Sequence, residues 1–232
     1  KSEYKRGFFT FGNNVVFTAY QSNPLYGYAR GGYLGIILQS IPSLRKYDPE
    51  NDKSGYGKVY GDATDVPNPL GILDENITQR ASNTYNAYIN LYAELKLPFG
   101  LKYRINATPD LSFDRNTAYE NVYDFGLRNN LVSNMQEYRY NRNNFLIENL
   151  LSFDKTFGKH KVTALLGYSF QEYHTRYIMA SGQALPDGIH EVGAATKNRM
   201  NDTNKNESAM TSIISRAFYS VSYTHLTLPT TP

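Results

Sequence analysis

The alternation of apolar and polar side chains is most regular between Asn83 and Asp114, where it repeats every two residues. The first apolar set is Tyr85, Ala87, Ile89, Leu91, Ala93, Leu95 and Leu97, and the interleaved set is Asn86, Tyr88, Asn90, Tyr92, Glu94 and Lys96. After Pro98-Phe99-Gly100 the alternation resumes with Leu101, Tyr103, Ile105 and Ala107 on the apolar side. A period of two indicates a β-strand with one apolar and one polar face. Two such runs around a short Pro/Gly turn predict a β-hairpin.

The same alternation predicts four further strands. They cover residues 7–21, 137–153, 161–173 and 208–223. Strands of soluble sheets have roughly 5–6 residues, and these runs are clearly longer. A strand that crosses a bilayer at a tilt needs about 9–11 residues, which these runs supply.

The connections alternate between short and long. Short turns are expected at residues 98–100 and 154–160, and long loops at 22–82, 115–136 and 174–207, with a short helix within 33–40. Strict alternation places every long loop at one end of the sheet, as in outer-membrane barrels with short periplasmic turns and long extracellular loops. The expected fold is therefore all-β, an antiparallel up-and-down sheet of about six long strands that forms a sector of a large transmembrane β-barrel, because closed single-chain barrels begin at about eight strands.

In such a sector the apolar faces contact lipid and the polar faces line the lumen. The expected lumen-facing residues are Tyr88, Tyr92, Glu94, Lys96 and Arg104. Aromatic girdles at the two membrane interfaces are expected from Phe99, Phe153 and Phe157 near the short turns and from Tyr85, Tyr168 and Tyr173 near the long loops.

Composition agrees with a β-rich membrane protein and excludes several other classes. Aromatic residues reach 14%, with 21 Tyr and no Trp, at a hydrophobic fraction of 41%. This combination disfavours disorder, and no apolar run approaches the ~20 residues of a transmembrane helix. A net charge of +3 is too small to indicate a nucleic-acid partner. The 232 residues contain no Cys, and they begin without Met, as expected of an internal fragment.

Candidate chemistry is sparse. The four histidines, His160, His174, His190 and His225, do not have metal-ligand spacing. Residues 48–59 resemble a calcium loop faintly but lack Gly at the sixth position and Glu at the twelfth. We therefore expect no catalytic residue, no metal and no cofactor. Two alternatives to a transporter sector remain open: a soluble β-sandwich module that binds carbohydrate, and a passive porin-type barrel.

Several motifs resemble SusC/RagA-like TonB-dependent outer-membrane transporters. The hairpin NLLSFDKTFGKH (149–160) followed by KVTALLGYSFQ (161–171) is similar to a hairpin of that family, including Gly158, Lys159, His160 and Gly167. The later Ala180-Ser181-Gly182 and Gly193-Ala194-Ala195-Thr196 resemble the loop that follows it. SIISRAFYS (212–220) resembles a family strand, with Arg216 in the place of the family's Arg, although Ile213, Ile214 and Ser215 depart from its pattern.

This resemblance implies a TonB-dependent receptor barrel domain over residues 1–223, with 224–232 as a non-native or disordered tail. It further implies a 22-stranded barrel with a plug and a segment that contacts the TonB–ExbB–ExbD complex, both outside these residues. The implied role is uptake of glycans, oligosaccharides or peptides with a SusD-like surface lipoprotein, in the outer membrane of a Gram-negative, Bacteroidetes-like cell. Outer-membrane lipid is the remaining implied partner.

Overall fold

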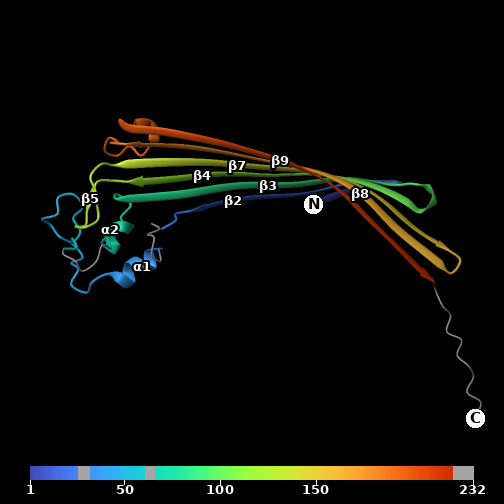
Figure 1. The fold of residues 1–232 in the computed structure, drawn as a ribbon, viewed down its shortest axis with the longest axis horizontal. Coiled ribbons are helices and arrows are strands. Elements are labelled where there is room, and N and C mark those ends of the chain that lie inside the picture. Colours follow the sequence, from blue (N-terminus) through green and yellow to red (C-terminus); the bar gives the residue numbers. More distant parts are fainter. Residues whose placement is uncertain (26–31, 61–65, 222–232) are drawn as a thin grey trace, which may run out of the picture.

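A single long antiparallel sheet dominates the fold. The computed structural model describes residues 1–25, 32–60 and 66–221. The sheet has seven strands in the order β1-β2-β3-β4-β7-β8-β9, and every strand pairs with the one before it (Figure 1). The strands are β1 (Ser2–Arg6), β2 (Phe9–Ser22), β3 (Thr78–Lys96), β4 (Leu101–Glu120), β7 (Asn134–Phe157), β8 (His160–Gln183) and β9 (Lys197–Val221). The all-β, up-and-down architecture predicted from the alternation is confirmed.

The structure corrects the number and the length of the strands. β1 was not predicted, because five residues with Tyr4 as their only apolar side chain show no alternation. β7, β8 and β9 have 24, 24 and 25 residues and continue into segments that the sequence assigned to loops 115–136 and 174–207. Neither face of these extensions is consistently apolar, so their sequence looks like that of a loop.

Connections of different length lie at opposite ends of the sheet. The short turns are Gly7-Phe8, residues 97–100 and Gly158-Lys159, and the long loops are 23–77, 121–133 and 184–196. Gly158 has a φ of 61°, a left-handed conformation that glycine adopts without steric cost. In Figure 1 the helices and long loops gather at one end, called here the loop end, and the turns lie at the other, the turn end.

Small elements occupy the loop end. Helix α1 (Gly32–Gln39) confirms the predicted helical segment, and α2 (Pro69–Leu73) begins at the cap residue Asn68, whose side chain accepts a hydrogen bond from the Leu70 N–H. Strands β5 (Tyr123–Asp124) and β6 (Asn129–Asn130) pair with each other, and two 3₁₀ turns cover Pro98–Gly100 and Val192–Ala194. Within residues 1–25, 32–60 and 66–221, no helix is long and apolar enough to span a membrane.

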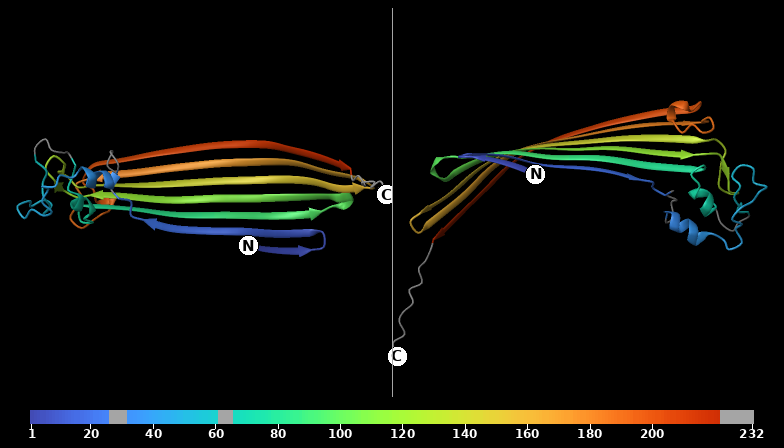
Figure 2. Two further views of the ribbon diagram at one scale, coloured as in Figure 1. Left: turned by 90° about the horizontal axis from the view of Figure 1, so that it is seen from below. Right: turned by 180° about the vertical axis from the view of Figure 1, so that it is seen from behind.

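The hydrophobic core lies at the loop end and not under the sheet. One buried cluster joins Ile72, Ile77, Tyr123 and Phe125, and a second joins Tyr119, Met135, Leu185 and Ala195. Along the middle of the sheet the strands form a single layer, as Figure 2 shows. Apart from the β5–β6 pair, the described residues form no second sheet. A β-sandwich needs two packed sheets, so the sandwich alternative does not fit this architecture.

Candidate functional site

The two faces of the sheet differ in chemistry, and the strand register defines them. Cross-strand partners in an antiparallel pair point to the same face. The row Phe11–Ala93–Ile105–Asn149–Tyr168–Ile213 lies on what we call the apolar face. The next row, Glu3–Gly12–Tyr92–Asn106–Glu148–Ser169–Ser212, lies on the opposite, polar face.

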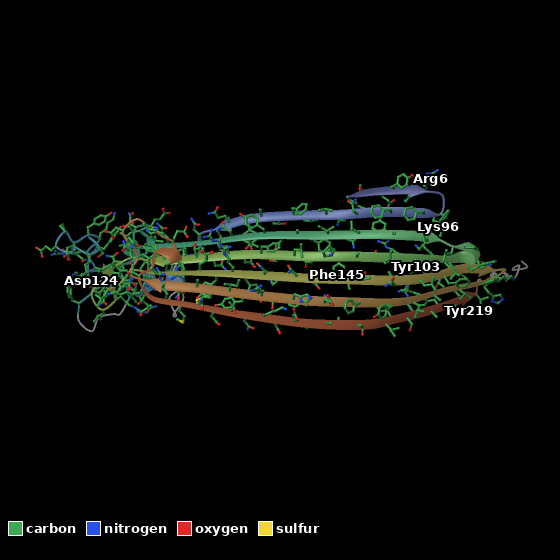
Figure 3. The ribbon with its side chains drawn as sticks, turned by 90° about the horizontal axis from the view of Figure 1, so that it is seen from above. Arg6, Lys96, Tyr103, Asp124, Phe145 and Tyr219 are labelled. Atoms are coloured by element: carbon green, nitrogen blue, oxygen red, sulfur yellow. The ribbon has the colours of Figure 1, made fainter. Side chains whose placement is uncertain are left out.

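Large apolar side chains on the apolar face are open to their surroundings. Phe17 and Ile213 are 73% and 77% exposed, and Tyr85, Leu166 and Tyr219 are each more than half exposed. Phe145 lies on this face in the middle of the sheet, whereas Tyr103 and Tyr219 lie toward the turn end (Figure 3). A contiguous exposed apolar surface of this extent indicates contact with a partner or a membrane.

Two asparagines interrupt the apolar face, and each has a hydrogen-bond partner on a neighbouring strand. Tyr103 donates its hydroxyl to Asn149 Oδ1 at 2.5 Å, and Asn13 Nδ2 donates to Ser2 Oγ at 2.8 Å. In hydrocarbon a polar group must find its partner within the protein. Both exceptions are therefore compatible with lipid contact.

The apolar band shifts toward the turn end from β4 to β9. Its last large side chain toward the loop end is Phe113 on β4, Phe145 on β7 and Phe170 on β8. The register partners of these three residues on the next strand are Asn141, Glu172 and Thr211, all polar. The band thus crosses the hydrogen-bonded rows obliquely, as expected of a bilayer around strands tilted by about 35–45°.

A network of polar side chains spans four strands on the polar face. Tyr92 donates its hydroxyl to Glu3 of β1, and its ring lies 4.2 Å from the Arg104 guanidinium carbon. Arg104 Nε donates to Asn106 Oδ1 at 2.8 Å, and Asn106 Nδ2 donates to Glu148 Oε2 at 3.1 Å. The network links β1, β3, β4 and β7 across the face that carries the sequence-predicted lumen residues.

Gly12 makes the link between Tyr92 and Glu3 possible. Tyr92 and Glu3 flank Gly12 in the same row, so the tyrosine side chain must cross β2. A Cβ atom at Gly12 would lie 2.4 Å from the Tyr92 Cζ atom. No other residue type leaves room for the ring, which explains the glycine in the middle of an otherwise regular strand.

The sequence-predicted residues lie together on the polar face. Tyr88, Tyr92, Glu94 and Lys96 alternate along β3, and Arg104 is the partner of Glu94 on β4. Glu94 Oε2 lies 3.5 Å from Lys102 Nζ and 4.0 Å from Arg104 Nη1. Lys96 lies at the turn end (Figure 3).

One expected girdle residue lies on the other face. Tyr173 pairs with Asn144 and Ser208 and points to the polar side of the sheet, because it follows Ser169 and Gln171 in the polar series of β8. Tyr85 and Tyr168 lie on the apolar face, and so do Phe153 and Phe157 near the turn end. Lys155 Nζ lies 5.7 Å and 5.2 Å from the ring centroids of Phe99 and Phe157.

The residues that carry the family motif do not form one cluster. Gly158, Lys159 and His160 form the β7–β8 turn, where His160 Nδ1 lies 2.6 Å from the Tyr219 hydroxyl. Gly167 lies beneath Leu150, and Arg216 lies over the Phe218 ring. Ser181 and Gly182 lie at the other end of β8, where a Cβ atom on Gly182 would meet Ala195 at 2.3 Å. These positions maintain the turn, the strand contacts and the packing of loop 184–196.

The long loops are held together by buried polar contacts. Asn51 is 2% exposed, and its Nδ2 donates to Ser54 Oγ, Tyr56 O and Asp124 O at 2.7–2.8 Å. Asn68 is 1% exposed, and its Nδ2 donates to the carbonyl oxygens of Arg45 and Gly57. Asn51 thereby joins loop 23–77 to loop 121–133.

One ionisable pair reinforces this contact between the loops, and a second lies within loop 23–77. Lys58 Nζ lies 2.8 Å from Asp124 Oδ2, and this pairing lowers the pKa of Asp124 and raises that of Lys58. Burial, aided by a hydrogen bond to Asp74 Oδ2 at 2.9 Å, raises the pKa of Tyr56 to about 12. Asp124 lies at the loop end, far from Lys96 and Tyr103 (Figure 3).

A hollow opens on the polar face near the loop end. Its volume is about 480 Å³, and its lining includes Arg80, Glu120, Asn134, Gln136, Ser181 and Gln183. Arg80 Nη2 lies 3.0 Å from Glu120 Oε1. Acidic and histidine side chains do not gather into a metal-binding group of three or more anywhere in the described part of the chain. The polar face therefore offers hydrogen-bonding groups and aromatic rings for binding.

An open, single-layered sheet of long amphipathic strands, with turns at one end and long loops at the other, is typical of part of an outer-membrane barrel. The comparisons agree. TonB-dependent receptor P3 of Formosa agariphila is 25% identical over 183 residues, which cover 78% of this chain and 18% of that protein. No protein-family model matches the chain.

Solved structures of a transporter share the fold. The RagAB peptide transporter matches with a TM-score of 0.74 at 18% identity, over 94% of this chain and 25% of the matched chain. The RagAB peptide importer in its "closed-closed" and "open-open" states gives TM-scores of 0.72 and 0.71 at 19% and 20% identity, over 94% of this chain and 25% and 24% of theirs. The predicted resemblance to TonB-dependent receptors is confirmed, and the fold is that of a sector of a transporter barrel.

The chain spans less than a fifth of the curated relative and about a quarter of the matched transporter chains. These relatives are receptors and transporters rather than enzymes, which fits the absence of predicted catalytic residues. Homologues of this kind are outer-membrane proteins.

Proposed function

We propose that this chain is a sector of the barrel wall of an outer-membrane TonB-dependent transporter that takes up nutrients, either glycans and oligosaccharides or peptides. The observation that carries the proposal is the pair of faces. An apolar band of bilayer height lies on one side of the sheet, and a connected polar network lies on the other. Such a sheet is stable where lipid contacts its apolar face and water contacts its polar face.

In this arrangement the polar face lines the lumen. Tyr88, Tyr92, Glu94, Lys96 and Arg104 then lie along the transport path on β3 and β4. Charged side chains are rarely buried without partners in a protein core, whereas a water-filled lumen accommodates them. Substrate enters from the loop end, past the hollow between Arg80 and Gln183, and leaves at the turn end.

The partners belong to the complete transporter. A SusD-like lipoprotein would cover the loop end, and the TonB–ExbB–ExbD complex would supply energy through a plug region outside this chain. The matched RagAB structures are those of a peptide importer, so peptide uptake is as compatible with the fold as glycan uptake. We propose residues 1–223 as one barrel segment; the tail 224–232 lies outside the described residues.

Cell fractionation and growth assays on the full-length protein that contains this chain test the proposal. We expect the protein in the outer membrane, with slower gel mobility after boiling, together with a co-purifying surface lipoprotein. Deleting its gene should abolish growth on at least one glycan or peptide source, and loss of TonB should have the same effect. Recovery in a soluble fraction would contradict a membrane role, and growth independent of TonB would indicate a passive porin.

A further inference from the structure

Three tyrosines form an aromatic surface on the polar face of β7 and β8. Tyr140 and Tyr177 are direct cross-strand partners. Tyr138 lies on the same face of β7, two residues toward the loop end. The ring centroids of Tyr138 and Tyr177 are 5.9 Å apart, with 31° between the ring planes. We call Tyr138, Tyr140 and Tyr177 the tyrosine platform.

The platform lies outside the membrane-facing part of the sheet. On β8 the regular apolar series ends at Phe170, seven residues before Tyr177 in the chain, and Glu172, His174 and Arg176 follow on that face before Ile178. On β7 it begins only at Phe145, five residues after Tyr140. Aromatic side chains here are therefore not part of a lipid-facing girdle. All three tyrosines are partly exposed on the polar side.

Polar side chains flank most of the platform, and Met179 lies opposite Tyr138 on β8. Arg142 lies 5.8 Å from the Tyr140 ring centroid, and its Nη2 lies 3.6 Å from Asp114 Oδ2. The Tyr138 hydroxyl donates to Gln136 Oε1 at 3.0 Å. The strand register places three more polar residues next to the platform. Asn116 lies opposite Tyr138, Asn204 lies opposite Tyr177, and Asp202 lies two residues from Asn204 toward the loop end.

The platform adjoins the hollow at the loop end. Gln136, which accepts the Tyr138 hydrogen bond, also lines that hollow of about 480 Å³. Tyr138 and Gln136 are two residues apart on β7 and so point to the same face. A ligand that enters between the long loops thus passes the hollow and then meets the tyrosines.

Rings flanked by amide, carboxylate and guanidinium groups match the two kinds of surface on a sugar. The C–H groups on one side of a pyranose pack on the face of an aromatic ring, and its equatorial hydroxyls need planar donors and acceptors at the rim. The charged side chains near the platform are Arg142, Asp114 and Asp202, one positive and two negative. This small net charge gives no strong attraction for a highly charged ligand and suits a neutral one.

We propose that the tyrosine platform is a subsite that binds a sugar ring of a neutral oligosaccharide on its way through the lumen. The proposal rests on the proposed function, because it places the polar face in the lumen. It selects carbohydrate over peptide as the substrate class of that path.

Binding assays on the full-length protein in detergent test this subsite. An array of neutral oligosaccharides identifies the best-bound sugar, and isothermal titration with that sugar measures its affinity. We expect Tyr177→Ala to weaken binding about tenfold or more, since an aromatic face is lost. Tyr177→Phe should retain most of the affinity, because the ring is kept. Tyr168→Ala, on the apolar face of the same strand, is the matched control and should bind as the wild type does.

A second variant, Tyr138→Ala, tests the platform independently in case Tyr177→Ala does not fold. The amount of each variant in the outer membrane measures whether it assembles. An array that binds no sugar would overturn the subsite, as would wild-type affinity in both correctly assembled alanine variants. Continued TonB-dependent growth on peptides in that case would leave the proposed function intact. A soluble protein would instead remove the proposed function itself.

Discussion

The assignment of the two faces predicts opposite effects for arginine at adjacent positions of β3. Leu91 lies on the apolar face, midway between Tyr85 and Leu97, and pairs with Asn13 and Ala107. Asn90 lies on the polar face, where its Nδ2 donates to Thr108 Oγ1 at 2.7 Å. We expect Leu91→Arg to block membrane assembly and Asn90→Arg to be tolerated.

The magnitude follows from the position of Leu91 at the centre of the apolar band. Arginine on the lipid face of a barrel costs about 2–4 kcal/mol near the midplane. At about 1.4 kcal/mol per factor of ten, this reduces the ratio of folded to unfolded protein by roughly 30- to 1,000-fold. At Asn90 the cost is limited to one hydrogen bond, about 1 kcal/mol.

Both variants are made in the full-length protein. Urea titration of its folding into lipid vesicles measures the free energy of unfolding, and cell fractionation with gel mobility before and after boiling measures assembly in cells. Leu91→Arg should shift the folding midpoint strongly and reduce the heat-modifiable band. Equal effects of the two substitutions would refute the assignment of lipid to one face and water to the other.

Three further predictions concern the polar network and the loops. Gly12→Ala should force the Tyr92 ring away from β2 and break its hydrogen bond to Glu3. We expect the free energy of unfolding in the same urea titration to fall by about 1–2 kcal/mol. Gly7→Ala is the control: Gly7 lies at a turn with open space, so this substitution should act only through the backbone conformation. Asn51→Ala should remove two hydrogen bonds within loop 23–77 and one to Asp124 of loop 121–133, at a cost of about 1–3 kcal/mol, detected as faster proteolysis of residues 23–77; unchanged proteolysis would contradict this role. The lowered pKa of Asp124 means that its pairing with Lys58 stabilises the loops fully above the ordinary aspartate pKa and progressively less as pH falls through the lowered value. The hydrogen-exchange protection factors of the loop amides, which are corrected for the intrinsic rate at each pH, should therefore fall in acid, and Asp124→Asn should abolish that dependence.

How far the sequence predicts the fold depends on whether a strand has two different faces. Asn83–Asp114 alternates throughout, and its hairpin, turn and faces are all found in the structure. The outer parts of β8 and β9, such as the stretch from His174 to Gln183, have no consistently apolar face. Nothing in their local pattern separates a solvated strand from a loop, and only pairing with the neighbouring strands identifies them.

The binding surface is less accessible to sequence reasoning than the strands. Tyr138 and Tyr140 lie close together in the sequence of β7, but their partner Tyr177 lies in segment 174–207, which the sequence assigned to a loop. The contact between Glu3 and Tyr92 joins residues 89 positions apart in the chain. A register shift by one residue would move either set to the opposite face.

The sequence by itself determined the chemistry of each strand and the order of short and long connections, because side-chain alternation and turn residues are local properties. Only the tertiary structure decided the register, and with it the oblique apolar band, the row from Glu3 to Ser212 and the tyrosine platform. Those features depend on pairing between distant strands. The hairpin Asn83–Asp114 illustrates both contributions. Its amphipathic pattern can be recognised from consecutive residues, but the residues that its two faces contact come from the other strands of the sheet.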